Sequence, residues 1–294
     1  PLYVDTAYAK WTAIHDDTWT LAGIIGKMVN PFDASPMVFD PDYTPEGGAL
    51  QAIYKFDDVN SFRFNGAAFV LDEISGSTRD PFLFGGQAFW DAKWSPKFST
   101  SLGVSAYDIV NTGNLSTTYD SNVGNTLVGT AYAANFNPVV VSGSATYSLE
   151  SFPLYHGAFP IKVAGEYLNN PGADSNNEGW WGGVTFGKSG KKGNWDISYR
   201  YQRLEADAWW DQVVNDDNVA AFTTPTSASL HGGTNIKGHL ITLNYSATDS
   251  LTVSFTAYLN DLINNPNPGQ KSDAYHLMAD LMWIEQVGAR GFAA

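Results

Sequence analysis

Cysteine is absent from this chain of 294 residues, and charged residues make up only 16% of it, where about 25% is usual. Without cysteine the protein has neither a disulfide framework nor a zinc–thiolate site. No segment offers the ~20 consecutive apolar residues of a membrane-spanning helix. Basic residues number 16 against 30 acidic ones, and the net charge of −14 argues against nucleic acid as a partner. Aromatic residues are abundant at 14%, which excludes a disordered chain.

Apolar and polar side chains alternate along most of the chain. Leu251, Val253 and Phe255, for example, alternate with Thr252 and Ser254. Because neighbouring side chains in a strand point to opposite faces, this pattern predicts strands with one apolar and one polar face. We expect thirteen strands, over residues 2–14, 18–28, 48–57, 61–74, 82–94, 98–111, 135–150, 160–170, 178–188, 193–206, 233–246, 251–260 and 273–286. No linker interrupts the pattern, so residues 1–294 are expected to form one all-β domain.

The expected strands are long, and their connections alternate in length. Most strands exceed the mode of about 5–6 residues in soluble proteins and reach the ~9–11 of a tilted membrane-spanning strand. Tight turns alternate with longer loops at 29–47, 75–81, 112–134, 171–177, 207–232 and 261–272. This asymmetry is typical of a transmembrane antiparallel up-and-down β-barrel of the bacterial outer membrane, with tight periplasmic turns and longer extracellular loops.

Strand parity predicts that the barrel is larger than this sequence. The first and the thirteenth strand both end on the side of the tight turns, whereas single-chain bacterial barrels have an even number of strands. We therefore expect an odd number of strands before Pro1, giving sixteen, or fourteen, in the full barrel. The stretch 127–133 could contain further β structure.

Tryptophans cluster at the expected strand ends. Those beside the tight turns or near the C-terminus are Trp11, Trp19, Trp94, Trp195 and Trp283. Indole is amphipathic and prefers the membrane–water interface, so this placement predicts an aromatic girdle. The alternative is that these residues cap the core of a soluble β-sandwich.

Several motifs resemble those of a known family. They are TWTLAGIIGKMVNPFD at 18–33, VFDPD at 38–42, PEGGAL at 45–50, GEYLNN at 165–170, GNWDISYRY at 193–201 and EAD at 205–207. In this order they resemble the putative porin family of outer membranes in Gram-negative bacteria, over roughly residues 3–284. The resemblance implies a sixteen-stranded channel with about three strands before Pro1. Residues 286–294 depart from it, because they do not finish on a strand-terminal aromatic.

Charged residues suggest how such a channel would select solutes. If three strands precede this sequence, residues 29–47 form the third extracellular loop, which folds inward and narrows the pore in general-diffusion porins. This loop carries Asp33, Asp40, Asp42 and Glu46 but no base. Lumen-facing strand positions carry Arg63, Asp91, Lys93, Lys162, Glu166, Arg200 and Asp280. Acids facing bases would set a transverse field at a constriction. Alternatively, the loop carboxylates only cap turns. The long loops hold 12 carboxylates and two bases. This excess of negative charge would attract cations to the outer mouth of the channel. Alternatively, it is surface charge that pairs with the divalent cations bridging lipopolysaccharide.

Other chemistry finds little support. The runs Asp40–Asp42 and Asn215–Asn218 could hold calcium weakly, since calcium prefers clustered oxygens, but neither has EF-hand spacing; no other cofactor is expected. Neither a strained-turn nucleophile motif nor a glycine-rich phosphate loop is present, so we expect no enzymatic activity.

The function predicted from the sequence is therefore passive diffusion. We expect an outer-membrane porin, a water-filled channel for ions and small hydrophilic solutes, with loop 29–47 as its constriction. From porins generally we expect a homotrimer surrounded by lipid and lipopolysaccharide. The alternatives are a solute-specific channel and a secreted soluble β-rich binding or adhesion module.

Overall fold

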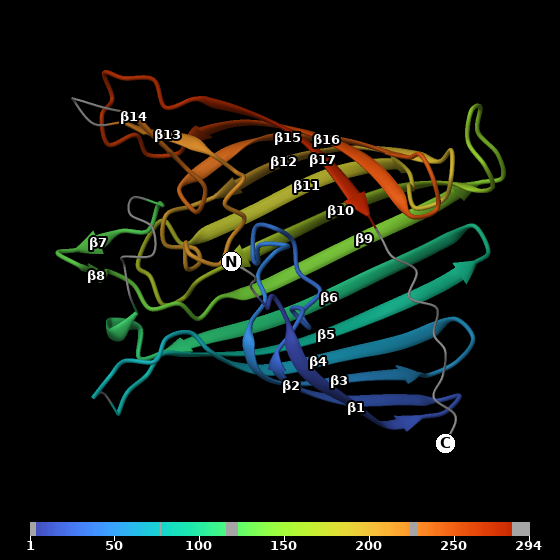
Figure 1. The fold of residues 1–294 in the computed structure, drawn as a ribbon, viewed down its shortest axis with the longest axis horizontal. Helices are drawn as coiled ribbons and strands as arrows, with labels where there is room; N and C mark the ends of the chain where they lie inside the picture. Colours follow the sequence, from blue (N-terminus) through green and yellow to red (C-terminus); the bar gives the residue numbers. More distant parts are fainter. Residues whose placement is uncertain (1–3, 77, 116–122, 224–227, 284–294) are drawn as a thin grey trace.

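The computed structural model describes residues 4–76, 78–115, 123–223 and 228–283, and it is almost entirely β (Figure 1). Its helical content within these residues is the 3₁₀ turn η1 (Thr112–Asn114). No helix in the described part of the chain is long and apolar enough to cross a membrane. The large sheet is built from β1 (Ala7–His15), β2 (Trp19–Lys27), β3 (Glu46–Lys55), β4 (Asn60–Val70), β5 (Phe82–Ser95), β6 (Phe98–Val110), β9 (Val139–Leu149), β10 (Phe159–Asn169), β11 (Glu178–Gly187), β12 (Trp195–Leu204), β15 (Ile236–Ser246), β16 (Leu251–Leu262) and β17 (Ala274–Trp283).

These thirteen strands form a single antiparallel meander. Each strand pairs with its neighbours in the sequence order, and among the described residues β1 and β17 pair on one side only. The expected all-β architecture and the thirteen predicted strands are confirmed, with boundaries that differ by a few residues. Two small hairpins stand apart from the sheet: β7 (Leu127–Val128) with β8 (Ala131–Tyr132), and β13 (Ala220–Thr223) with β14 (Ala228–His231). The first lies in the stretch suspected of further β structure, whereas the second was expected to be loop.

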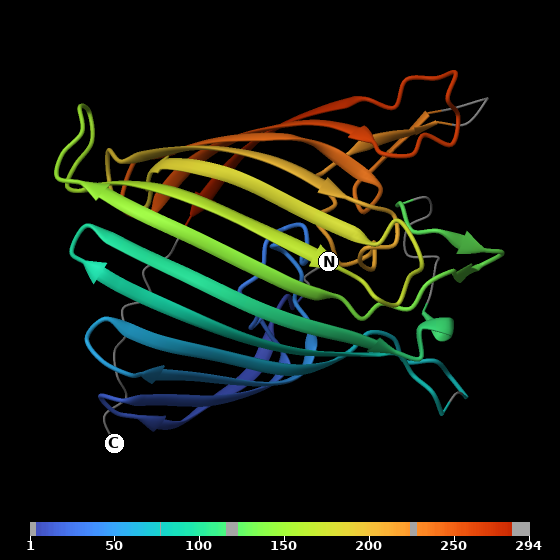
Figure 2. The same ribbon diagram turned by 180° about the vertical axis from the view of Figure 1, so that it is seen from behind.

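The sheet curls around an interior, and its two ends differ. Figures 1 and 2 show the small hairpins β7–β8 and β13–β14 at one end, which we call the long-loop end. The turns β1–β2, β3–β4 and β5–β6 lie at the opposite, short-turn end. The turn between β1 and β2 is closed by Asp16, whose carboxylate accepts the backbone N–H groups of Thr18 and Trp19 at 2.8 and 2.6 Å. These hydrogen bonds hold the pKa of Asp16 below its usual value.

The outer face of the sheet is apolar. Because successive side chains point to opposite faces, one set of alternating positions faces outward along every strand. Large apolar side chains exposed there are Ile25, Leu50, Leu102, Val141, Val163, Leu243 and Phe255. Soluble monomers rarely expose contiguous apolar surface beyond a few hundred Å². This surface is therefore suited to apolar surroundings.

Aromatic rings flank this apolar surface toward the short-turn end. Trp19 stacks on Tyr54 with ring centroids 4.5 Å apart, and Tyr54, Phe62 and Trp90 follow one another in register across β3, β4 and β5. Trp94 is also exposed and donates from Nε1 to Thr100 Oγ1 at 2.9 Å. The indole of Trp195 donates to the Leu154 carbonyl at 3.0 Å.

Two of the tryptophans predicted for the girdle differ from this group. Trp11 lies in the middle of β1, opposite Gly23, so its expected position at a strand end was wrong. The error arose mainly because β1 starts at Ala7 and not at residue 2 as expected, so that Trp11 is the fifth of its nine residues. Trp283 ends β17, and its side chain lies outside the described part of the structure.

Candidate functional site

The connection between β2 and β3, residues 28–45, folds inward onto the sheet; we call it the inner loop. Met28, Phe32, Val38 and Phe39 are buried. Phe32 packs edge-on against Phe69 and Tyr107, at centroid distances of 5.7 and 5.2 Å. The loop is thus fixed to the inner face by apolar contacts.

Gly85 provides the space in which Phe32 sits. A Cβ at position 85 would lie 2.4 Å from the Phe32 ring. We expect Gly85→Ala to displace the ring and weaken docking of the inner loop by ~1–3 kcal/mol, the usual range for overpacking. The matched control is Gly86→Ala, because a Cβ there meets nothing within 4 Å. Thermal unfolding followed by near-UV circular dichroism should show a lower Tm for the first variant only; equal Tm values would contradict this packing.

Asp33 of the inner loop contacts Arg63 on β4, in the large sheet, which we call the wall. The Arg63 guanidinium donates from Nη1 to Asp33 Oδ2 at 2.8 Å and from Nε to Asp91 Oδ2 at 2.5 Å, and it lies 4.5 Å from the Phe89 ring centroid. Gln87 holds the Asp33 backbone, accepting from its N–H at 2.9 Å and donating to its carbonyl at 3.1 Å. We call Asp33, Arg63 and Asp91 the charged triad.

The charged triad remains in contact with solvent. The Asp33 side chain is 60% exposed and that of Arg63 30%. Cavities of about 790 and 260 Å³ open beside the triad, and Asp33 and Arg63 line both of them. An ion or solute moving between these spaces would pass a fixed cation with carboxylates on two sides, an arrangement that orients dipoles and discriminates charges.

A second contact fixes the inner loop deeper in the wall. The Ser35 hydroxyl donates to Glu166, and Trp181 Nε1 also donates to Glu166, at 3.3 Å. The Arg200 guanidinium lies 5.3 Å from the Trp181 ring centroid. Glu166 and Arg200 were predicted as residues of the pore wall. Glu166 lies on the inner face, lines the cavity of about 260 Å³ and is buried where the inner loop covers it; Arg200 is half-buried beside it.

The loop between β12 and β15 also folds inward, which the sequence analysis missed. Its residues 205–219, here the second loop, include Trp209, which is fully buried and donates from Nε1 to the Val38 carbonyl at 2.8 Å. Asp40 N–H donates to the Val213 carbonyl at 2.7 Å, and Asn215 N–H to that of Pro36 at 3.0 Å. Six of the nine residues from Ala206 to Val214 are apolar, including Trp209 and Trp210; this content, unusual in an exposed loop, was the available signal.

The remaining acids of the inner loop do not join the charged triad. Asp40 accepts the Asp216 N–H at 3.2 Å, and burial between the loops raises the pKa of Asp40. Asp42 is exposed in a turn, its N–H bonded to Asp40 Oδ1 at 2.7 Å, and Glu46 is exposed at the start of β3. Of the four predicted constriction acids, the structure therefore brings only Asp33 to the wall charges.

The other predicted wall residues lie on the inner face. Lys162 and Lys93 are exposed there, on β10 and β5. Asp280 is exposed on β17, in register with Ser254. Among the described residues, no three metal-ligating side chains are grouped so as to hold a metal ion.

Asp211 joins the second loop to residues 123–133. Its carboxylate accepts the Asn125 N–H at 3.1 Å and the Tyr132 hydroxyl at 3.3 Å, while its own N–H donates to Asn125 Oδ1 at 2.8 Å. Burial raises the pKa of Asp211 to about 6, although the hydrogen bond from Asn125 opposes this shift.

This raised pKa predicts a pH-dependent stability. Because the folded-state pKa exceeds the unfolded value, the stabilisation is greatest at low pH and is lost as the pH rises through about 6. We expect Asp211→Asn to raise stability at pH 8 by on the order of 1–3 kcal/mol and to have little effect at pH 4. Comparing Tm with wild type from pH 4 to 8 tests this. A Tm difference that does not change with pH would contradict it.

An antiparallel meander curled around inward-folded loops, with an apolar outer face and a charged triad inside, defines a protein of the porin class. The family model described as "Putative porin" matches residues 1–150, and the chain belongs to this family. The expected resemblance is thus confirmed, and it supports a porin-like role and, in general terms, an outer-membrane location. The motifs noted at 165–207 lie beyond the matched residues. No curated protein matches the chain.

Proposed function

We propose that this protein is an outer-membrane porin, a water-filled channel for passive diffusion of ions and small hydrophilic solutes. The observation that carries the proposal is the inner loop, which holds Asp33 against Arg63 of the wall with cavities beside the pair. The inner loop would limit the solute's width, and the charged triad would select its charge. No enzymatic step and no cofactor form part of this proposal.

The two faces of the sheet support a membrane protein over a soluble binding module. Leu50 and Ile25 are 63% and 69% exposed on the outer face, where lipid would remove them from water. The inner face carries polar groups such as Gln87 and Asp91. This is the apolar-out, polar-in alternation of a transmembrane barrel.

We further propose that additional strands close the barrel between β1 and β17. An unpaired strand edge presents free N–H and C=O groups, which lipid cannot satisfy. The parity of the strands favours a total of sixteen, or fourteen, and the homotrimer and the contact with lipopolysaccharide expected of porins belong to the same proposal. A shallow groove of about 610 Å³ on the outer face of β1–β4, lined by Gly23, Gly48 and Gly66, offers a contact surface for a neighbouring protomer of that homotrimer.

Single-channel recording of the full-length protein tests the proposed function. In a planar bilayer under a KCl gradient we expect large, persistent conductance steps, often in groups of three, and a reversal potential that reports the selectivity. The control is the same preparation after heat denaturation, monitored by its shifted gel migration. The absence of conductance in a folded, heat-modifiable sample would refute the open channel. Solubility without detergent would favour the secreted module.

A further inference from the structure

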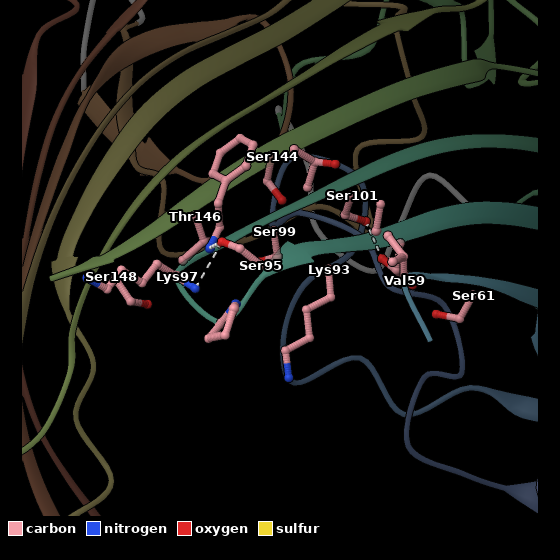
Figure 3. Close-up of a pocket in the computed structure, with 15 residues that line it drawn as sticks. Val59, Ser61, Lys93, Ser95, Lys97, Ser99, Ser101, Ser144, Thr146 and Ser148 are labelled. Carbon is pink, nitrogen blue, oxygen red and sulfur yellow. Dashed lines mark hydrogen bonds between the residues drawn. The ribbon is translucent and has the colours of Figure 1, made fainter. Parts of the chain in front are cut away.

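The inner face carries a cluster of hydroxyl groups toward the short-turn end, on β6 and β9. We define the hydroxyl field as Ser99, Ser101, Ser144, Thr146 and Ser148, which line one cavity of about 280 Å³. Ser99 pairs in register with Thr146 and Ser101 with Ser144. Figure 3 shows these residues together with Lys93 around the cavity. A solute on this wall would meet hydroxyls in successive rows.

Two lysines lie on opposite sides of the hydroxyl field. Lys162 on β10 is in register with Thr146, and Lys93 on β5 lies at the bulge that faces Ser99. Four adjacent strands thus place Lys93, Ser99, Thr146 and Lys162 in one transverse row. At ~4.8 Å between strands, the lysine Cα atoms are roughly 14 Å apart. A solute of a few carbon atoms would fit between the two ammonium groups.

These lysines carry charge that the wall does not neutralise. Within the described residues neither belongs to an ion pair, in contrast to Lys97, whose ammonium lies 2.6 Å from Glu150. The one carboxylate lining the cavity, Asp91, is already bonded to Arg63 at 2.5 Å and to the Ser101 hydroxyl at 2.6 Å. Lys93 and Lys162 therefore offer the hydroxyl field two ammonium groups without a carboxylate partner among the described residues, and these groups favour anions.

Phe98 is the aromatic residue among those that line the hydroxyl-field cavity, and the rings that line the neighbouring cavity are covered. The Phe89 ring is covered by the Arg63 guanidinium, and the Trp181 ring by that of Arg200, at 4.5 and 5.3 Å. Recognition at this wall would therefore rest mainly on hydrogen bonds and charge. The neighbouring cavity beside the charged triad shares Asp91, Ser101 and Ser144 with this one and is also lined by Lys162, so the two form one continuous polar surface.

We propose that the hydroxyl field, with Lys93 and Lys162, is a weak binding site for small hydroxylated carboxylates such as sugar acids. The carboxylate would lie between the two ammonium groups, and its hydroxyls would bond to Ser144, Thr146 and their neighbours. The proposal rests on the proposed channel function and deepens it. Because the site lies near the short-turn end, away from the acidic long loops, it is reached more easily from that side.

The test uses gluconate as the probe and glucose as its uncharged counterpart. Added to the full-length protein in a planar bilayer, gluconate is expected to reduce the KCl current at lower concentration than glucose, and more strongly from the short-turn side. The double variant Lys93→Gln/Lys162→Gln should raise the apparent Kd for gluconate at least tenfold. Its control is Lys188→Gln/Lys191→Gln, which removes the same charge from the turn between β11 and β12 and should leave the Kd unchanged.

Calorimetric titration of gluconate into the detergent-solubilised protein separates this inference from the channel itself. Lysine-dependent binding without conductance would refute the channel and retain the site. Conductance with equal effects of gluconate and glucose, or with a gluconate Kd that the Lys93/Lys162 variant leaves unchanged, would overturn the site and retain the channel. Unchanged heat-modifiable migration of each variant verifies that it folds.

Discussion

Replacing Trp209 by alanine is expected to destabilise the protein more than any other change considered, by about 3–5 kcal/mol, the usual cost of truncating a buried aromatic residue. Trp209 is fully buried. Its ring packs against Phe39, Tyr107 and Phe136 at centroid distances of 6.1, 5.6 and 6.4 Å, and its indole bonds the Val38 carbonyl. One side chain thus joins the second loop, the inner loop and the wall.

Losing this contact should affect conductance as well as stability. Without Trp209 the second loop no longer packs on the inner loop, which keeps its contacts at Gly85 and Glu166. Because the inner loop is then held less firmly, we expect larger and noisier channel openings together with a lower Tm. Trp180→Ala is the matched control, because Trp180 is 41% exposed on the outer face and packs on Tyr201. Similar losses of Tm in the two variants would contradict the role of Trp209 in holding the second loop, the inner loop and the wall together.

Arg63→Gln is expected to give the largest change in selectivity. The substitution removes the cation that lies between Asp33 and Asp91 and leaves two carboxylates facing the passage. A difference of ~1 kcal/mol for an ion about 4 Å from one uncompensated charge in water corresponds to about a fivefold change in an equilibrium ratio. Because K⁺ and Cl⁻ are affected in opposite directions, the K⁺/Cl⁻ permeability ratio, obtained from the reversal potential, should rise by roughly fivefold to 25-fold.

Arg203→Gln provides the matched control for this measurement. Arg203 lies on the outer face toward the long-loop end and pairs with Glu205 at 2.9 Å, away from the charged triad. Its loss should leave the permeability ratio unchanged. Tm should fall by similar amounts in the two variants, since the two arginine side chains are exposed to a similar extent, 30% and 32%. Equal permeability ratios for wild type and Arg63→Gln would remove the triad from the selectivity mechanism.

The wall was predictable because a strand's pattern is local. Alternation placed a strand at 160–170, where β10 spans Phe159–Asn169, and it assigned Arg63 and Lys162 to the inner face, where both lie. Neither assignment depends on distant residues. The same reasoning misplaced Trp11, because alternation does not fix where a strand begins, and β1 begins at Ala7.

The interior of the protein was not predictable in the same way. Loops have no period, so the apolar residues around Trp209 indicated burial but not the partner Val38, and nothing local indicated that Ser35 would bond Glu166. Asp40 and Asp33 look alike in the sequence, yet one meets the second loop and the other meets Arg63. These choices depend on contacts between segments far apart in the chain.

The meander of the sheet also determines an order of assembly. Every strand of the wall pairs with a neighbour in the sequence, so closing each hairpin costs little chain entropy, whereas the bond from Trp209 to Val38 joins residues 171 positions apart. Contacts of such separation form late. The strands of the wall should therefore pair one hairpin after another, and the two loops should pack together only when the surrounding strands have formed. Burial of Trp209 would then be one of the last steps of folding.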